Sequence, residues 1–317
     1  MKFAVYGVSR SGKDYFIEKL QLYFSEQGVP LTHIKGSETL NEFAFEKYGV
    51  KFKQCDESQK NKLRKKFIAY VAEIEKSYAY VAVDGHYAFY NENCELYSVC
   101  TESDINCYEQ FFYIDTEPSA VAERMRNSVG DKKNTDISEE QIRCWQDYEI
   151  DGLTTELLAA EKELHIIKYD NEFALEYVFN CVTKNMFDSR AIAKSMVEKL
   201  NIDASCIILT DCDRTLSFED SATFAFDFMK KSKTFLKEIY KNDRYSNYQL
   251  WRAQLCAEEL GVYTEESMNY SVKNITPNAD LINDLRRIEN ACIIGITAGN
   301  GELWNRIAKK FDLPITI

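Results

Sequence analysis

The sequence has few of the residues that break or cross-link a fold. Its 317 residues include four prolines and twelve glycines, which excludes collagen-like and low-complexity chains. Three histidines and ten cysteines without a C-x-x-C pair favour neither a zinc site nor a disulfide framework. We expect reduced, mostly buried thiols, and no metal at Cys94, Cys100 and Cys107, whose spacing fits no common ligand pattern.

Long apolar runs are also absent. The N-terminal apolar run meets glycine and charge too soon to be a signal peptide, and no stretch of about 18 apolar residues follows. We therefore expect a soluble, cytoplasmic protein that does not enter a membrane.

Positive charge is scarce in the first part of the chain. Residues 1–185 carry 22 Lys and Arg against 32 Asp and Glu, whereas residues 186–317 carry 17 against 19. An acidic surface suits a nucleic-acid backbone poorly, because binding there depends on cations that release counterions. We expect a small phosphorylated molecule as partner rather than nucleic acid.

Strand and helix patterns alternate along residues 1–185, which predicts an α/β fold with a parallel sheet covered on both faces. A helical pattern follows the first strand and ends at Gly28. The predicted strands are Lys2–Gly7, Tyr78–Tyr87, Glu109–Glu117 and Leu164–Asp170.

The pattern starts again near Asn185. The chain is longer than the roughly 100–200 residues of a usual domain, so we predict two domains, 1–185 and 186–317. In the second domain, the strands Ser205–Asp211 and Ala291–Asn300 flank a largely helical segment, about 217–290. We interpret this segment as an insert between two core strands.

The stretch "GVSRSGKD" fits the phosphate-binding pattern G-x-x-x-x-G-K between a strand and a helix. Such a loop turns backbone N–H groups toward phosphates, the helix start adds positive potential, and a lysine reaches the outer phosphates. The residues expected to contact ATP are Gly7, Ser9, Arg10, Ser11, Gly12, Lys13 and Asp14.

Asp14 stands where Ser or Thr is usual, and a carboxylate there can hold Mg²⁺ directly or through water. The "SGKD" form resembles P-loop kinases of small phosphorylated metabolites and nucleotides. Over about residues 1–185 the chain looks like a member of the nucleoside monophosphate kinase-like group. The resemblance implies ATP and Mg²⁺ as cofactors.

Asp84 follows a predicted strand in "VAVDGHY", at the edge where ligands of open α/β sheets bind. The resemblance implies a role for Asp84 toward Mg²⁺ or the acceptor, and the alternative is a turn or a helix cap. His86 is either structural or in contact with substrate.

Arg124 and Arg126 lie in "AERMRNSVGDKK", where kinases of this type place a mobile lid. Arginines that close over a transferring phosphoryl group neutralise its charge and expel water. The alternative is a solvated helix face with Arg–Glu pairs. Arg143 belongs to the same class, and the basic run around Arg64 either binds an anionic acceptor or is solvated.

The stretch "CIILTDCDRTL" has an apolar strand followed by D-x-D-x-T and resembles the haloacid dehalogenase (HAD) phosphatases. Of two carboxylates at a strand end, one can attack phosphorus and the other can transfer the leaving-group proton, with Mg²⁺ offsetting their repulsion. The resemblance implies Asp211 as nucleophile and Mg²⁺ ligand, and Asp213 as general acid/base whose backbone carbonyl also binds Mg²⁺. Thr215 would hold the turn near the phosphate.

Thr297, after the next core strand, is implied as a ligand of the phosphoryl oxygens. The helical insert resembles the cap of phosphoserine phosphatase-like members, and Arg214 replaces a common glycine. The family's later lysine and acidic pair are not found after Thr297, since Lys309 and Lys310 come too early. We expect impaired metal binding and turnover in this half.

The leading hypothesis is a bifunctional enzyme, an ATP-dependent kinase joined to a Mg²⁺-dependent HAD phosphomonoesterase. One alternative is a polynucleotide kinase/phosphatase, and another is a regulatory nucleotide-binding protein with an inactive HAD-like half. The sequence identifies neither the acceptor nor the oligomeric state.

Overall fold

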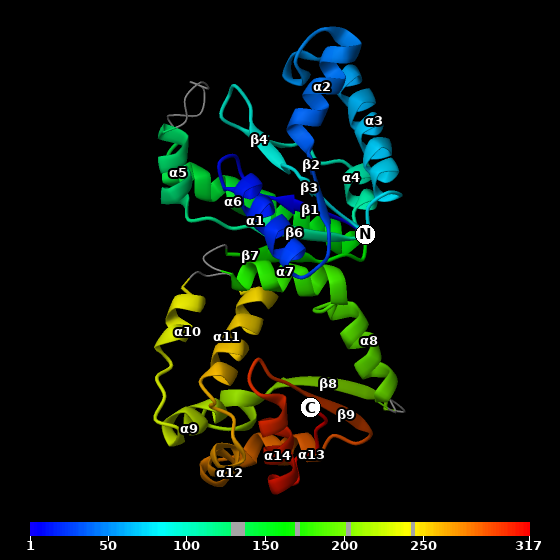
Figure 1. Ribbon diagram of the computed structural model, residues 1–317. Coiled ribbons are helices and arrows are strands. Elements are labelled where there is room, and N and C mark those ends of the chain that lie inside the picture. The colour runs from blue at the N-terminus through cyan, green and yellow to red at the C-terminus, as the bar shows by residue number, and fades with distance from the viewer. Residues whose placement is uncertain (128–136, 169–171, 201–203, 242–244) are drawn as a thin grey trace. The chain divides into compact units, whose positions relative to one another are not determined.

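The computed structural model describes residues 1–127, 137–168, 172–200, 204–241 and 245–317 (Figure 1). The chain divides into two compact units, Met1–Ser189 and Arg190–Ile317. Within the described ranges, no helix combines the length and the apolar character that crossing a membrane requires.

Unit 1 contains a five-stranded sheet in the order β2-β3-β1-β6-β7, in which every neighbouring pair is parallel. The α/β fold class with a parallel sheet is therefore confirmed for this unit. The chain builds β2 and β3 on one side of β1 and then crosses to β6 on the other side. The strands are β1 (Lys2–Tyr6), β2 (Leu31–Lys35), β3 (Tyr80–Asp84), β6 (Gln110–Ile114) and β7 (Leu164–Ile167).

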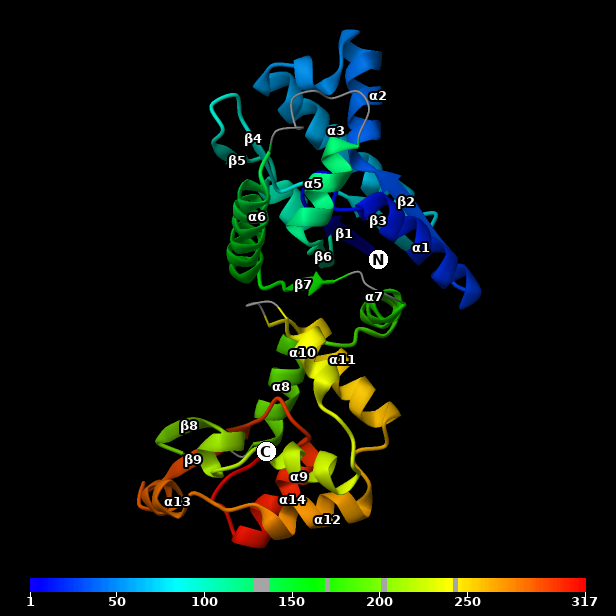
Figure 2. The same cartoon turned by 90° about the vertical axis from the view of Figure 1, so that its left-hand side faces the viewer.

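Successive side chains of each strand point to opposite faces of the sheet, and both faces are covered. Phe3 and Phe112 meet edge to face at 5.6 Å on one face, and Tyr6 stacks with Phe111 at 6.3 Å on the other. Helices α1 (Lys13–Glu26) and α6 (Glu139–Ala159) lie on opposite sides of the strands (Figure 2). Both faces are thus removed from water, as a parallel sheet requires.

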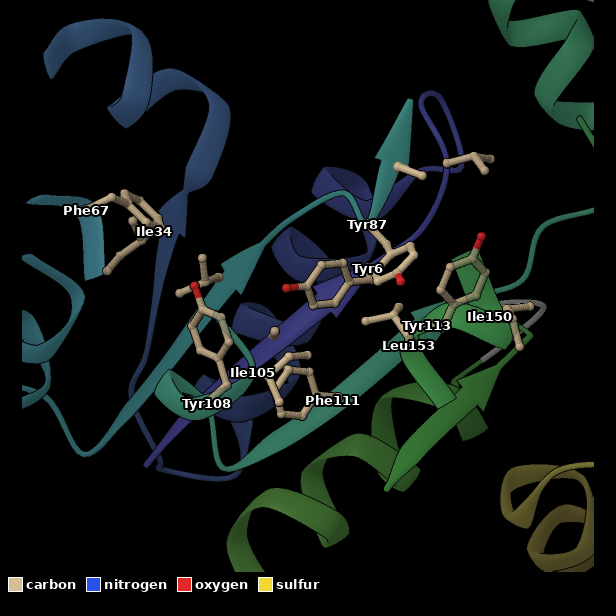
Figure 3. Packing of buried hydrophobic residues seen from close by; sticks show 14 of the residues in the cluster. Tyr6, Ile34, Phe67, Tyr87, Ile105, Tyr108, Phe111, Tyr113, Ile150 and Leu153 are labelled. Carbon is tan, nitrogen blue, oxygen red and sulfur yellow. The ribbon is translucent and has the colours of Figure 1, made fainter. Parts of the chain in front are cut away.

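The core on the α6 side is rich in aromatic rings. The rings of Tyr6 and Tyr108 both pack near Phe111, and Tyr113 lies on the same strand as Phe111 (Figure 3). Burying such a side chain contributes about 1.5–3 kcal/mol to folding. The remaining elements of unit 1 are α2 (Gly36–Tyr48), a short helix (Phe52–Gln54), α3 (Glu57–Glu75), β4 (Ala88–Tyr90), β5 (Leu96–Ser98), α4 (Glu102–Cys107), α5 (Pro118–Arg126) and α7 (Phe173–Lys184).

Unit 2 is built around a parallel pair of strands, β8 (Cys206–Asp211) and β9 (Ala291–Ile296). Trp304, on α14 (Gly301–Phe311), is fully buried in one core with side chains of β9, α12 and α13. A separate small cluster joins α9 and α11. The other elements are α8 (Ser189–Lys199), a turn (Cys212–Leu216), α9 (Ser221–Phe228), α10 (Thr234–Ile239), α11 (Asn247–Glu259), α12 (Glu265–Asn274) and α13 (Ala279–Arg286).

Helix α6 packs so closely against Tyr87 that no side chain fits at Gly152. Alanine usually stabilises a helix over glycine by about 1 kcal/mol, but a Cβ at this position would lie 2.5 Å from Cζ of Tyr87. That ring is buried, and its hydroxyl donates to Glu156, so it cannot easily move. We expect Gly152→Ala to lower the free energy of unfolding by about 1–3 kcal/mol in urea titrations.

The control is Leu158→Ala on the same helix, because Leu158 is 72% exposed. This change should stay within about 0.5 kcal/mol of the wild type. A Gly152→Ala protein more stable than the wild type would contradict the packing described for α6.

Candidate functional site

The connection between β1 and α1 is a tight loop that requires glycine at Gly7 and Gly12. Gly12 has φ 97°, and a Cβ on it would lie 3.1 Å from Nη1 of Arg124. A Cβ on Gly7 would lie 2.8 Å from Oγ of Ser11. The Ser11 amide donates to the Val8 carbonyl at 3.1 Å, which closes the turn. The local geometry is that of a phosphate-binding loop preceding a helix.

Lys13 folds back over this loop. Its ammonium group donates to the carbonyl oxygens of Gly7 at 2.6 Å and Val8 at 3.2 Å. Burial lowers the pKa of Lys13, and the nearby carboxylates of Glu149 and Asp84 oppose that change. The cation therefore lies at the loop, where the sequence predicts it.

Arg124 supports the same loop from outside. Its guanidinium donates to the carbonyls of Ser11 at 2.8 Å and Arg10 at 3.2 Å, and Thr116 adds a hydrogen bond to Ser11 at 2.7 Å. Arg126 is exposed at the end of α5. The rest of the lid predicted from the sequence, residues 128–133, lies outside the described residues.

Three further charged residues predicted from the sequence, Arg143, Asp14 and Arg64, lie at different positions in unit 1. Arg143 pairs with Glu117 at 3.9 Å. Asp14 is exposed in the first turn of α1, next to Lys13. Arg64 lies on α3, away from the loop in sequence, and lines the cavity described below.

Asp84 is the last residue of β3 and is buried. One of its oxygens accepts hydrogen bonds from Nε2 of His33 at 3.1 Å and from the amide of Gly36 at 3.0 Å. Burial alone would raise the pKa of Asp84, but these donors and the charge of Lys13 hold it below its ordinary value. Asp84 is therefore a carboxylate that also caps the start of α2.

A cavity of about 620 Å³ opens beside Asp84. His86 lines it, and Nδ1 of His86 has no hydrogen-bond partner among the described residues. Burial lowers the pKa of His86 well below its ordinary value, which favours the neutral ring. The wall also includes Gly36, Leu40, Lys51, Phe52, Lys53, Glu57, Lys60, Arg64, Phe67, Phe89, Tyr90, Tyr97, Cys100, Asp104 and Tyr108.

The sequence interpretation missed most of this wall. It considered Asp84, His86 and Arg64, but it did not assign the hairpin of β4 and β5 or the strand β2. The signal available was the density of aromatic residues after Asp84, in "HYAFYNENCELY". Only the folded hairpin brings them to the same space as the lysines of residues 51–60.

Glu149, in the middle of α6, is a second residue that the sequence interpretation missed. Its carboxylate accepts hydrogen bonds from the amides of Tyr87 at 3.1 Å and Ala88 at 3.0 Å, and from the hydroxyl of Tyr113 at 3.0 Å. Burial raises the pKa of Glu149 to about 7. It holds the segment after Asp84 against α6 and β6. A glutamate at helical spacing from Ile142, Trp145 and Leu153 was the available signal.

In unit 2 the two aspartates have different surroundings. Asp211, at the end of β8, is exposed, and Thr215 donates to one of its oxygens at 2.9 Å. The carboxylate of Asp213 accepts from the Ser221 amide at 2.6 Å and from the Trp304 indole N–H at 3.0 Å.

Parallel pairing of Asp211 with Ile296 brings the next residue, Thr297, to the same edge. The Thr297 hydroxyl donates to Asp213 at 3.4 Å. Thr297 and Thr215 therefore contact one aspartate each. Trp304 was missed from sequence, because its contact depends on how α14 packs.

The oxygen atoms here can supply part of a Mg²⁺ site. Among the described residues no donor reaches the second oxygen of Asp211, whereas both oxygens of Asp213 are occupied. Mg²⁺ keeps several waters and needs few protein ligands, so Asp211 can serve as one. In the described ranges, no three His, Cys, Asp or Glu side chains gather in a metal-binding group. Lys310, which comes too early in the sequence to match the lysine of the HAD phosphatases, donates to the carbonyl of Val272 on α12.

Replacing Glu149 by glutamine tests the buried carboxylate. The folded pKa of about 7 exceeds the ordinary 4.5, so the stabilisation from proton binding is complete below pH 4.5 and is lost as the pH rises to about 7. Glutamine keeps the acceptor for Tyr87 and Ala88 without this loss. We expect Glu149→Gln to gain up to about 3 kcal/mol relative to the wild type between these pH values.

The measurement is urea denaturation across pH 4.5 to 8. The exposed Glu73→Gln variant on α3 is the control and should follow the wild-type profile. A Glu149→Gln profile parallel to that of the wild type would refute the buried, proton-binding carboxylate.

Replacing Trp304 by phenylalanine tests the support of Asp213. The change keeps an aromatic ring in the core and removes the indole donor. We expect unit 2 to lose about 1.5–3 kcal/mol, the usual contribution of a hydrogen bond to a charged group. The loss should shrink in an Asp213→Ala background, measured as a double-mutant cycle. An additive cycle would mean that the indole does not support Asp213.

No protein-family model and no curated protein matches this sequence. Solved structures similar to the chain include two proteins of low sequence identity. A shikimate kinase from Bacteroides thetaiotaomicron has 12% identity and a TM-score of 0.34, covering 62% of this chain and 98% of that one. A chain of the Pnkp1/Rnl/Hen1 RNA repair complex has 13% identity and a TM-score of 0.30, covering 98% of this chain and 76% of that one.

Proposed function

We propose that unit 1 is an ATP-dependent kinase domain that phosphorylates a small molecule. The observation that supports this proposal best is the placement of Lys13, Asp84 and the 620 Å³ cavity at one edge of the sheet. Ligands of open α/β sheets bind at the carboxyl ends of the strands, where the chain order reverses. Here that reversal falls at β1, between β3 and β6.

The loop amides and the start of α1 would hold the ATP phosphates. Lys13 would exchange the carbonyls of Gly7 and Val8 for phosphate oxygens, and Arg124 would face the same charge. The terminal phosphoryl group would pass from ATP to an acceptor oxygen, leaving ADP. Asp84 would orient that oxygen and take its proton when the acceptor is a hydroxyl. Mg²⁺ bound near Asp14 would offset the phosphate charge.

We propose that unit 2 is a HAD-type phosphomonoesterase domain, with the helical segment of about residues 217–290 as its cap. An unoccupied oxygen on exposed Asp211 suits it to attack phosphorus, which would form an aspartyl phosphate and release the alcohol. Asp213 would transfer the proton to the leaving oxygen and then take one from the water that hydrolyses the intermediate. Thr297 would orient the phosphoryl oxygens.

A polynucleotide kinase/phosphatase is the second candidate. The basic run that starts at Lys60 borders the cavity, and both Lys60 and Arg64 line it. A 5′-hydroxyl end could enter there while further phosphates follow α3. The acidic balance of residues 1–185 favours the small acceptor instead.

Two variants separate the two proposed activities. Lys13→Ala should lower transfer from labelled ATP by at least about a hundredfold, because the loop loses its cation. Asp211→Asn should abolish phosphate release and leave transfer unchanged. Acceptors to compare are mononucleosides, sugar phosphates and a 5′-hydroxyl oligonucleotide.

The control is Lys76→Ala, an exposed lysine beyond α3, which should change neither activity. Labelling of the oligonucleotide alone would support the second candidate. A wild-type protein that binds ATP but labels no acceptor and releases no phosphate would favour a regulatory role.

A further inference from the structure

The cationic residues of the cavity lie in one continuous segment of the chain. Lys51 and Lys53 belong to the short helix region, and Lys60 and Arg64 follow one turn apart on α3. The Arg64 guanidinium lies over the ring of Phe52, 5.6 Å from its centroid. One wall of the cavity is therefore basic.

Glu57 pairs with two of these cations. Its carboxylate lies 2.8 Å from Nζ of Lys60 and 3.8 Å from Nη1 of Arg64. The hydrogen bond from Lys60 lowers the pKa of Glu57, so the group is ionised at neutral pH. The Glu57 side chain is 72% exposed, and such pairs contribute little to stability, so a ligand anion can displace it.

The cavity wall carries four cations, Lys51, Lys53, Lys60 and Arg64, and three carboxylates, Glu57, Asp84 and Asp104. Asp84 and Asp104 also line the cavity, but they accept hydrogen bonds from His33 and from Thr101 respectively. Of these three carboxylates, Glu57 is the one that pairs with Lys60 and Arg64. A phosphomonoester carries a charge of about −1.5 to −2 at pH 7, whereas a carboxylate carries −1.

Aromatic side chains from the hairpin and from the sheet also line the cavity. Phe89, Tyr90 and Tyr97 come from the hairpin of β4 and β5, and Tyr6 and Tyr108 from the sheet side. Figure 3 shows Tyr6 and Tyr108 in the core cluster that also contains Phe67. Apolar walls with few polar groups bind ring systems.

We propose that this cavity binds a ring-bearing phosphomonoester, whose phosphate replaces the Glu57 carboxylate on Lys60 and Arg64. The proposal rests on the proposed kinase function only in making that molecule the acceptor. Glu57 then sets the affinity, because it competes with the ligand for the same two cations.

The test measures binding of phenyl phosphate by calorimetry in a Lys13→Ala, Asp211→Asn background, which removes the cation of the competing loop and the nucleophile proposed for unit 2. Two matched probes separate the features of phenyl phosphate. Benzoate keeps the ring but carries one negative charge, and methyl phosphate keeps the phosphate but has no ring. We expect both to bind more weakly than phenyl phosphate. Arg64→Ala and Lys60→Ala should each weaken phenyl phosphate binding by about tenfold or more, since each removes a charged donor.

Glu57→Gln is the decisive variant, because it should tighten phenyl phosphate binding by roughly two- to fivefold. Its control is Glu46→Gln, which removes a carboxylate paired with Lys66 at 3.3 Å outside the cavity wall. Unchanged or weaker binding by Glu57→Gln, or benzoate binding as tightly as phenyl phosphate, would overturn the proposal.

The outcomes for the site and for the kinase function are separable. If phenyl phosphate binding follows Glu57, Lys60 and Arg64 while no acceptor is phosphorylated, the site stands and the kinase proposal fails. If an acceptor is phosphorylated with a KM that none of the three variants changes, the kinase function stands and the site is refuted.

Discussion

The loop between β1 and α1 depends on one constraint, which is that side chains must donate to the carbonyl oxygens that its own backbone amides do not satisfy. Lys13 donates to the Gly7 and Val8 carbonyls from inside the loop, and Arg124 and Thr116 donate to Ser11 from outside. The Ser11 amide also donates to the Val8 carbonyl at 3.1 Å, so backbone and side-chain donors together hold the loop. An incoming phosphate would therefore compete with the loop itself for Lys13.

Helix α6 connects this loop to the segment that follows Asp84 at the same edge of the sheet. Glu149 accepts from the amides of Tyr87 and Ala88, and Trp145 donates to the Ala88 carbonyl at 3.0 Å. Gln146 donates to the carbonyl of Thr116, the residue that supports Ser11. One helix thus fixes both the segment after Asp84 and the outer support of the loop. Buried polar groups of this kind specify geometry because each unsatisfied one would be costly.

The same rule of parallel sheets organises both units, although the groups at the strand ends differ. In unit 1 the edge carries backbone amides, a cation and one capping carboxylate. In unit 2 it carries Asp211 with an open oxygen and Asp213 with donors on both oxygens. The two aspartates, two residues apart, therefore differ in whether a carboxylate oxygen is left without a donor among the described residues. That difference follows from the packing of Trp304 and α9 rather than from the D-x-D spacing.

The α/β pattern, the glycine loop with Lys13, and the strand-end positions of Asp84 and Asp211 could be predicted from the sequence. These features are local, because they depend on periodicity and on residues within one turn of each other. Three other properties follow from the packing of the folded chain: which oxygens accept hydrogen bonds, where Glu149 and Trp304 act, and how the β4–β5 hairpin and α3 enclose one cavity. Those properties depend on contacts between residues that lie tens of positions apart in the sequence. The burial pattern of one segment does not show which other segment packs against it.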